Sequence, residues 1–230
     1  MNSVPVITVD GPSGSGKGTI AQGLATELGW HLLDSGAIYR VLALAAEQTG
    51  IAANDTARLA ALAEALPVTF ERAGQGVRAH LKGQDVSDQI RTETCAAGAS
   101  RLAAIAAVRK ALLVRQRDFR APPGLVADGR DMGSVVFPDA QTKIFLIASP
   151  AERAKRRYKQ LIEQGINANL GRLEHDIAAR DERDAARATA PLLPADDAVV
   201  LDSTGLAIQD VLDRALEIAR ERGLVTGVGT

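Results

Sequence analysis

A glycine-rich run near the N-terminus restricts the fold more than any other feature of the sequence. It consists of Gly11, Pro12, Ser13, Gly14, Ser15, Gly16, Lys17, Gly18 and Thr19. An apolar segment that predicts a strand precedes it, Val4–Asp10, and a helical pattern follows it, Ile20–Leu28. Glycines let the backbone N–H groups turn inward, and together with the helix N-terminus they form an anion site that Lys17 can reach. The run therefore predicts a phosphate-binding loop; the alternative is a glycine-rich turn without a ligand.

One residue departs from the common form of this loop. That form has Ser or Thr directly after the lysine, and its hydroxyl holds Mg²⁺, whereas here Gly18 stands between Lys17 and Thr19. Direct ligation of the metal by a loop side chain is therefore in doubt. Asp128, at the end of a predicted buried strand, is the carboxylate that we expect to face the water shell of the ion.

Short apolar runs, each followed by a helical pattern, predict the fold class. After the first strand they are Trp30–Leu33, Leu125–Asp128, Lys143–Ala148 and Ala198–Asp202. Several lack polar alternation, which is typical of strands buried on both faces. We therefore predict an α/β fold with a five-stranded parallel sheet and helices on both of its faces.

Two segments interrupt this alternation. Between Pro67 and Gln89 apolar residues recur with period two, and Gly74, Gly76 and Gly83 mark turns, which predicts small antiparallel hairpins. The second segment, 151–190, holds nine basic and seven acidic residues and few apolar ones. It opens with a capping box, Ser149–Glu152, and its first helix is predicted to end at Gly165. We expect one domain over residues 1–230, with a β insert at about 66–92 and a mobile helical lid at about 151–190.

Composition excludes several classes of protein. Lys and Arg number 27 against 28 Asp and Glu, which argues against a protein that coats nucleic acid. No apolar run approaches the roughly 18 residues that span a bilayer. The single cysteine, Cys95, excludes an internal disulfide, fits a reducing compartment and is expected to be a small buried residue. We expect a cytoplasmic monomer without membrane or nucleic-acid partners.

A basic stretch lies between the two insertions. Residues 91–120 hold seven basic and two acidic side chains, and a long helix is predicted over Thr94–Arg120. Its solvated face would carry Arg115, Arg117 and Arg120. Arg109 differs, because Leu102, Ile105 and Leu112 would share its helical face. Its guanidinium either reaches solvent from the edge of this face or binds a polar ligand in a cleft.

Two further motifs follow predicted strands. Residues 34–40 come after the second strand, where Ser35 would cap a helix and Arg40 would lie on its second turn. Asp128, Gly129, Arg130 and Asp131 end the third strand. Ligands of open α/β sheets bind beyond the carboxyl ends of the strands. The two motifs therefore predict a second anion site beside the first; a helix cap and a surface ion pair are the alternatives.

The predicted lid carries a cluster of arginines. Its members are Arg180, Arg183 and Arg187, together with Asp184. In a helix, Arg180, Asp184 and Arg187 would share one face. The cluster predicts either intrahelical ion pairs, above all Arg180 with Asp184, or a positive clamp on a transferred phosphoryl group.

These motifs together closely resemble the bacterial cytidylate kinase family. The likeness rests on residues 11–19, 33–40, 128–133 and 180–187 and extends over roughly residues 4–222. It implies reversible transfer of a phosphoryl group from ATP to CMP or dCMP, with Mg²⁺ held mainly by phosphates and water and Thr19 on a phosphate. It also implies that the β insert belongs to the monophosphate-binding side.

The resemblance also implies a role for each matching residue. The acceptor phosphate would be bound by Ser35, Arg40, Arg130 and Arg187. The cytosine edge would be bound by Ser100, Arg109 and Asp131, and the ribose by Arg180 and Asp184. The catalytic set would be Lys17, Arg130, Arg183 and Arg187.

Two other functions stay open. A kinase of the same fold could act on UMP, dTMP or a non-nucleotide metabolite, and a regulatory module could bind ATP without transferring phosphate. A guanine-specific switch is disfavoured, because the sequence lacks an N-K-x-D motif. The D-x-x-G match at Asp202–Gly205 is interpreted as the N-cap of the last helix. The acceptor phosphate is already an anion, so no general base is required, and His31, His80 and His175 are interpreted as structural.

Overall fold

The computed structural model describes residues 4–73, 76–163, 165–187 and 189–224. The chain forms two compact units, residues 1–33 with 120–230 and residues 34–119, which we call unit 1 and unit 2. Gly74, predicted to lie in a hairpin turn, falls outside the described residues. The interpretation as one domain with two insertions stays a prediction.

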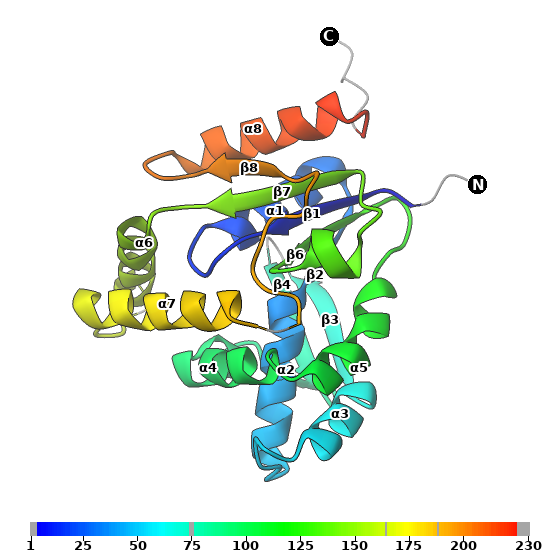
Figure 1. The fold of residues 1–230 in the computed structure, drawn as a ribbon, viewed down its shortest axis with the longest axis vertical. Helices are drawn as coiled ribbons and strands as arrows, with labels where there is room; N and C mark the ends of the chain where they lie inside the picture. The colour runs from blue at the N-terminus through cyan, green and yellow to red at the C-terminus, as the bar shows by residue number, and fades with distance from the viewer. Residues whose placement is uncertain (1–3, 74–75, 164, 188, 225–230) are drawn as a thin grey trace. The chain divides into compact units, whose positions relative to one another are not determined.

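Unit 1 is built on the predicted parallel sheet (Figure 1). Its strands are β1 (Val6–Asp10), β2 (His31–Asp34), β6 (Leu125–Gly129), β7 (Thr142–Ile147) and β8 (Val199–Asp202), in the order β2-β6-β1-β7-β8. The register places Asp10 opposite Gly129 on one side and Phe145 on the other. The five-stranded parallel sheet is confirmed, with ends that differ from the predicted ones by a residue or two.

Burial explains why the central strands show no polar alternation. Every residue of β1 and of β6 is buried, so both faces of these strands require residues that pack in the core. The edge strand β8 instead alternates between half-buried and exposed positions. Because β1 is the central strand, the glycine-rich run that follows it lies at the middle of the carboxyl-terminal end of the sheet.

Two helices of unit 1 pack side by side on the sheet. They are α1 (Lys17–Leu28) and α8 (Ile208–Glu221), and Leu24 and Ala215 lie in the core that they share with the strands. Helix α1 is capped by Gly29, which has a left-handed φ of 65° and whose N–H bonds to the carbonyls of Ala25 and Thr26. A π-helical turn, η2 (Met132–Val136), packs against β1 and β6.

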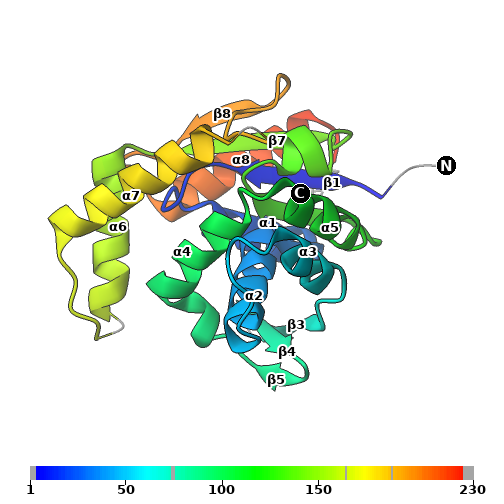
Figure 2. The same cartoon turned by 60° about the horizontal axis from the view of Figure 1, so that its bottom comes forward.

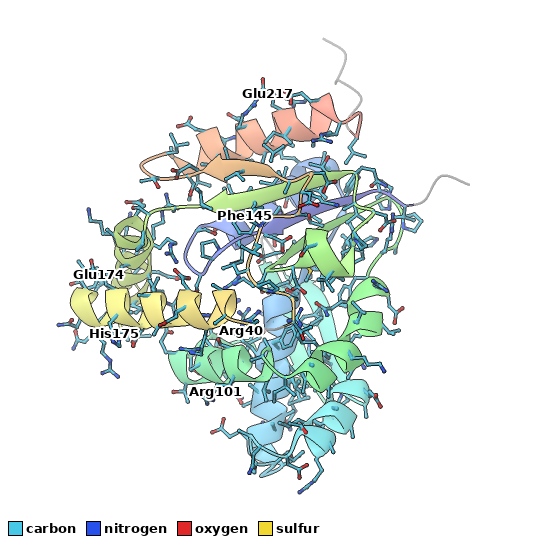
Figure 3. The ribbon with its side chains drawn as sticks, viewed as in Figure 1. Arg40, Arg101, Phe145, Glu174, His175 and Glu217 are labelled. Carbon is cyan, nitrogen blue, oxygen red and sulfur yellow. The ribbon has the colours of Figure 1, made fainter. Side chains whose placement is uncertain are left out.

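The segment predicted as a lid, after β7, forms two helices that pack on each other (Figure 2). They are α6 (Pro150–Glu163) and α7 (Leu170–Ala185). The Ser149 hydroxyl accepts the N–H of Glu152 at 3.3 Å, as predicted for the N-cap. Glu174 and His175 are exposed on α7 (Figure 3). Arg187 lies beyond the helix end, so it does not continue the helical face of Arg180 and Asp184 that we predicted.

Unit 2 contains helices and a small antiparallel sheet (Figure 2). Its helices are α2 (Ser35–Gln48), α3 (Thr56–Glu64), α4 (Glu93–Leu102) and α5 (Ala106–Arg117), with a 3₁₀ turn η1 (Gln89–Arg91). The strands are β3 (Val68–Ala73), β4 (Gly76–Leu81) and β5 (Gln84–Asp85), in that order. The predicted hairpins are confirmed. Cys95 is a buried free cysteine on α4, as expected.

The single long helix predicted over Thr94–Arg120 is wrong. Helix α4 ends at Leu102 and α5 begins at Ala106, because the backbone of Ile105 is extended, with φ −87° and ψ 112°. Arg109 donates from Nη1 to the Ala103 carbonyl at 3.3 Å, which satisfies an acceptor at the break. Leu102 therefore lies on another helix than Arg109 and does not share its helical face.

Two predicted helix caps are also wrong. Ser35 is the first residue of α2, and the N-cap is Asp34, whose Oδ1 accepts the N–H of Ala37 at 2.8 Å. Asp202 accepts the N–H of Thr204 at 2.8 Å and so closes a local turn, while α8 begins later, with Ala207 at its N-cap. In the described part of the chain, no helix is both long and apolar enough to cross a membrane.

Candidate active site

The glycine-rich run forms a tight loop between β1 and α1. Gly11, Gly14 and Gly16 have φ of 150°, 78° and 92°, which side chains disfavour. A Cβ on Gly11 would lie 2.1 Å from the Leu146 carbonyl oxygen, so only glycine fits there. Gly16 is the N-cap of α1 and has no capping side chain, which leaves the first N–H groups of the helix for an anion.

Two polar side chains of the loop are Lys17 and Ser15. Lys17 Nζ donates to the Pro12 carbonyl at 3.3 Å, so its side chain folds back along the loop. Ser15 is fully buried, and its hydroxyl donates no hydrogen bond to any described residue. A Cβ on Gly18 would lie 3.2 Å from Asp128 Oδ2. Asp128 therefore lies beside Gly18, which occupies the position of the Ser or Thr in the common form of this loop.

Asp10 connects the end of β1 to the loop after β6. Its Oδ1 accepts the N–H of Met132 and its Oδ2 accepts the N–H of Gly133, both at 2.8 Å. Burial raises the pKa of Asp10 to about 7, and the nearby negative charges of Asp131 and Asp128 add to this, although the two N–H bonds favour the ionised form. Asp10 thus fixes the backbone next to Arg130 and Asp131, a role that the sequence reasoning missed.

Asp184 brings together two of the predicted phosphate-binding arginines. Its carboxylate is 1% exposed, accepts from Arg130 Nε at 3.1 Å and also accepts from Arg187 Nη2. Arg130 Nη1 donates further to the Gly129 carbonyl at 3.2 Å. The three ionised groups carry one net positive charge, which suits an anionic ligand.

The other predicted residues of unit 1 lie on the same segments. Arg180, on α7, donates from Nη1 to the Ser13 hydroxyl at 3.3 Å, so α7 reaches the glycine-rich loop. Arg183 is exposed in the last turn of α7. Asp131 is buried at the start of the π-helical turn η2.

The predicted site residues of unit 2 lie on helices α2, α4 and α5. Arg40 pairs with Asp34 at 2.9 Å, and the Cys95 thiol donates to the Arg40 carbonyl at 3.2 Å. Burial raises the pKa of this thiol. Ser100 is buried on α4, and Arg109 lies on the first turn of α5. That these residues form one site with those of unit 1 stays a prediction.

Comparison with known proteins identifies the family. The family model described as cytidylate kinase matches residues 7–221. The chain belongs to the cytidylate kinase family. Cytidylate kinase of Nitrosococcus oceani is 62% identical over 215 residues, 93% of this chain and 95% of that protein. Cytidylate kinase of Stutzerimonas stutzeri is 57% identical over 226 residues, 97% of this chain and 99% of that protein.

A solved structure, TT1252 from Thermus thermophilus, is more distant than these cytidylate kinases. It is 19% identical in sequence, and the match covers 98% of this chain and 100% of the TT1252 chain. Its TM-score to this chain is 0.47.

This cytidylate kinase family member also has a cavity that the sequence did not predict. Its volume is about 500 Å³, and it lies beside the glycine-rich loop. Its walls are Gly16 and Thr19 at the start of α1, Arg156 and Gln160 of α6, and the segment from Ser203 to Val211 that leads into α8. The walls combine apolar and polar groups, as pockets for small molecules do. The D-x-x-G match at Asp202–Gly205 was interpreted only as a helix cap, so the sequence analysis did not connect Ser203 with a cavity.

Proposed function

We propose that this chain transfers the γ-phosphoryl group of ATP reversibly to CMP or dCMP, with ADP and CDP or dCDP as products. Membership of the cytidylate kinase family carries the proposal. The loop of Gly11–Thr19 at the start of α1 supports it with a site for a polyphosphate. Arg130 and Arg187, which both pair with Asp184, support it with a site for a second anion in the same unit.

The donor nucleotide would occupy the loop and the neighbouring cavity. Inward N–H groups and Lys17 would hold the phosphates, and the buried Ser15 hydroxyl offers one more donor. The cavity of about 500 Å³ starts at Gly16 and Thr19, so it lies within reach of a base attached to these phosphates. Its apolar residues, Ile20 and Val211, would cover the face of the base.

Mg²⁺ would be bound together with the nucleotide. Among the residues that the structure describes, no three or more His, Cys, Asp and Glu side chains form a group that could hold a metal ion. The donor set nevertheless fits a hydrated ion, because Asp128 stands beside Gly18 and near Asp10. When bound, the ion would neutralise charge on the donor phosphates.

The acceptor nucleotide would be bound by the residues that the family resemblance implies. We assign its phosphate to Ser35, Arg40, Arg130 and Arg187, its base to Ser100, Arg109 and Asp131, and its ribose to Arg180 and Asp184. The attacking phosphate oxygen is already ionised, so catalysis rests on alignment and on positive charge, from Lys17 and from Arg130, Arg183 and Arg187. Closure of α6 and α7 over the site would keep water from accepting the phosphoryl group.

A panel of acceptors tests this function. ADP release is measured with ATP, Mg²⁺ and, in turn, CMP, dCMP, UMP, dTMP and no acceptor. We expect rapid release with CMP or dCMP and little with the others, because a wrong base leaves buried polar groups unpaired. Faster release with UMP or dTMP would assign a different acceptor. Binding of ATP without release that depends on any of these acceptors would contradict the proposed transfer to CMP or dCMP.

A further inference from the structure

Arg153 is a buried arginine of unit 1 that the proposed reaction does not use. It lies in the first turn of α6 and is 3% exposed. Its guanidinium donates to three different segments: from Nε to the Ala148 carbonyl at 3.0 Å, from Nη1 to the Ser13 carbonyl at 3.0 Å, and from Nη2 to Asp181 Oδ2 at 2.6 Å. The segments are the residue that follows β7, the glycine-rich loop and α7.

A second arginine repeats the contact to the loop. Arg156, one turn further along α6, donates from Nη1 to the Ser15 carbonyl at 3.1 Å. Between these two carbonyls lies Gly14, where a Cβ would stand 3.1 Å from Arg153 Cβ. Helix α6 therefore packs directly on the loop, with one guanidinium on each side of Gly14.

These contacts have a physical reason. A loop that turns its N–H groups toward an anion turns carbonyl groups the other way, and a buried carbonyl without a donor is costly. Arg153 supplies the donor and so fixes the peptide plane that follows Ser13. The planar guanidinium can serve three acceptors in a fixed geometry, which a lysine ammonium cannot reproduce.

The contact to Asp181 joins the loop to α7. Asp181 follows Arg180, whose Nη1 donates to the Ser13 hydroxyl at 3.3 Å. Ser13 is thus reached from α7 by two routes, directly through Arg180 and indirectly through Arg153. Asp184, which holds Arg130 and Arg187, lies less than one turn further along the same helix.

We propose that Arg153 is a positioning residue that aligns the phosphate loop with the arginine-bearing helix α7. The proposal rests on the proposed phosphoryl transfer. Arg153 acts through the Ser13 carbonyl on donor binding and through Asp181 on the groups that surround the transferred phosphoryl. The two contacts have separable effects, because one belongs to the loop and the other to α7.

Two conservative variants separate these effects. Arg153→Lys keeps the charge but loses the three-way contact, so we expect the dissociation constant of ATP to rise about tenfold and kcat to fall about tenfold, within the range known for misplaced groups. Asp181→Asn loses only the charge on α7, so we expect kcat to fall about tenfold and the ATP dissociation constant to stay within twofold. Arg172→Ala, which breaks an exposed pair with Asp176 on the same helix, is the control and should change neither.

The measurements are calorimetric titration with ATP alone, steady-state kcat and KM for each nucleotide, and the melting temperature. Values of kcat and ATP affinity within twofold of the native protein in Arg153→Lys would overturn the proposal, as would a lower melting temperature with unchanged kinetics. Weakened ATP binding in Asp181→Asn equal to that in Arg153→Lys would overturn the separation into two effects. If Arg153→Lys does not fold, Asp181→Asn still decides the contact to α7. If the native protein does not phosphorylate CMP, the proposed function fails, while the ATP titration still tests the contact to the loop.

Discussion

Replacing Asp10 by Asn should remove a specific pH dependence from the stability of this protein. Asp10 is 6% exposed, and both of its carboxylate oxygens accept backbone N–H bonds from the loop after β6. Its pKa in the folded protein is raised to about 7, mainly by burial, whereas its ordinary value is 3.8. Between these two values the folded state holds a proton that the unfolded state has lost.

The sign and size of the effect follow from this difference. Where the folded state binds more protons, the free energy of unfolding falls as the pH rises. The contribution of Asp10 is therefore fully present below pH 3.8 and is lost as the pH rises through about 7. Between pH 5 and pH 7.5 the loss amounts to roughly 2 to 3 kcal/mol, at about 1.4 kcal/mol per pH unit.

The assay is urea unfolding of the native protein and of Asp10→Asn at several pH values between 5 and 7.5. Asn does not titrate, so the native protein should lose roughly 2 to 3 kcal/mol more than the variant over this range. Asp210→Asn, an exposed position on α8, serves as the control. Parallel pH profiles for the native protein and Asp10→Asn would refute the argument that burial keeps Asp10 protonated.

Three other variants test the proposed site. Lys17→Ala should keep the fold and lower turnover about 100-fold, as the loss of one charge-stabilising donor does; unchanged turnover in a steady-state assay would contradict its role. Arg109→Gln should weaken CMP binding and spare ATP binding in calorimetric titrations. Equal weakening of both would mean that its bond to the Ala103 carbonyl, at the break between α4 and α5, is its main role. Asp184→Asn leaves Arg130 and Arg187 without their carboxylate and should cost about 3 kcal/mol of stability in urea unfolding and raise the KM for CMP; a loss below 1 kcal/mol would contradict this.

The sequence predicted the sheet well, because its signals are local. Buried parallel strands are short apolar runs without alternation, and the glycines at residues 11, 14 and 16 are demanded by the backbone itself. The β insert was equally visible from its period of two. In each case the residues that carry the signal are neighbours in the chain.

Predictions from local sequence patterns failed where tertiary packing determines the ends of helices. No glycine or proline marks the break between α4 and α5, so propensity alone extended the helix through Ile105. Asp34 and Ser35 are both good N-cap residues, and only the observed backbone, extended at Asp34, distinguishes them. Arg187 lies beyond α7 and still reaches Asp184, which helical periodicity could not indicate.

Contacts between segments that are far apart in the chain could also not be predicted from the sequence. Asp10 meets Met132 because the parallel register of β1 and β6 places the ends of both strands together. Arg153 meets Ser13 and Asp181 because α6 packs on the loop and on α7. Each of these side chains taken alone is an ordinary charged residue in the sequence, so its role becomes apparent only from the fold.

Tracing the transferred group tests the central claim most directly. The protein is incubated with Mg²⁺, CMP and ATP labelled in its γ-phosphate, and the products are separated. We predict that the label appears in CDP, with one CDP formed for each ADP. Label found in inorganic phosphate, or ADP formed at the same rate without CMP, would contradict transfer between two nucleotides bound by this chain.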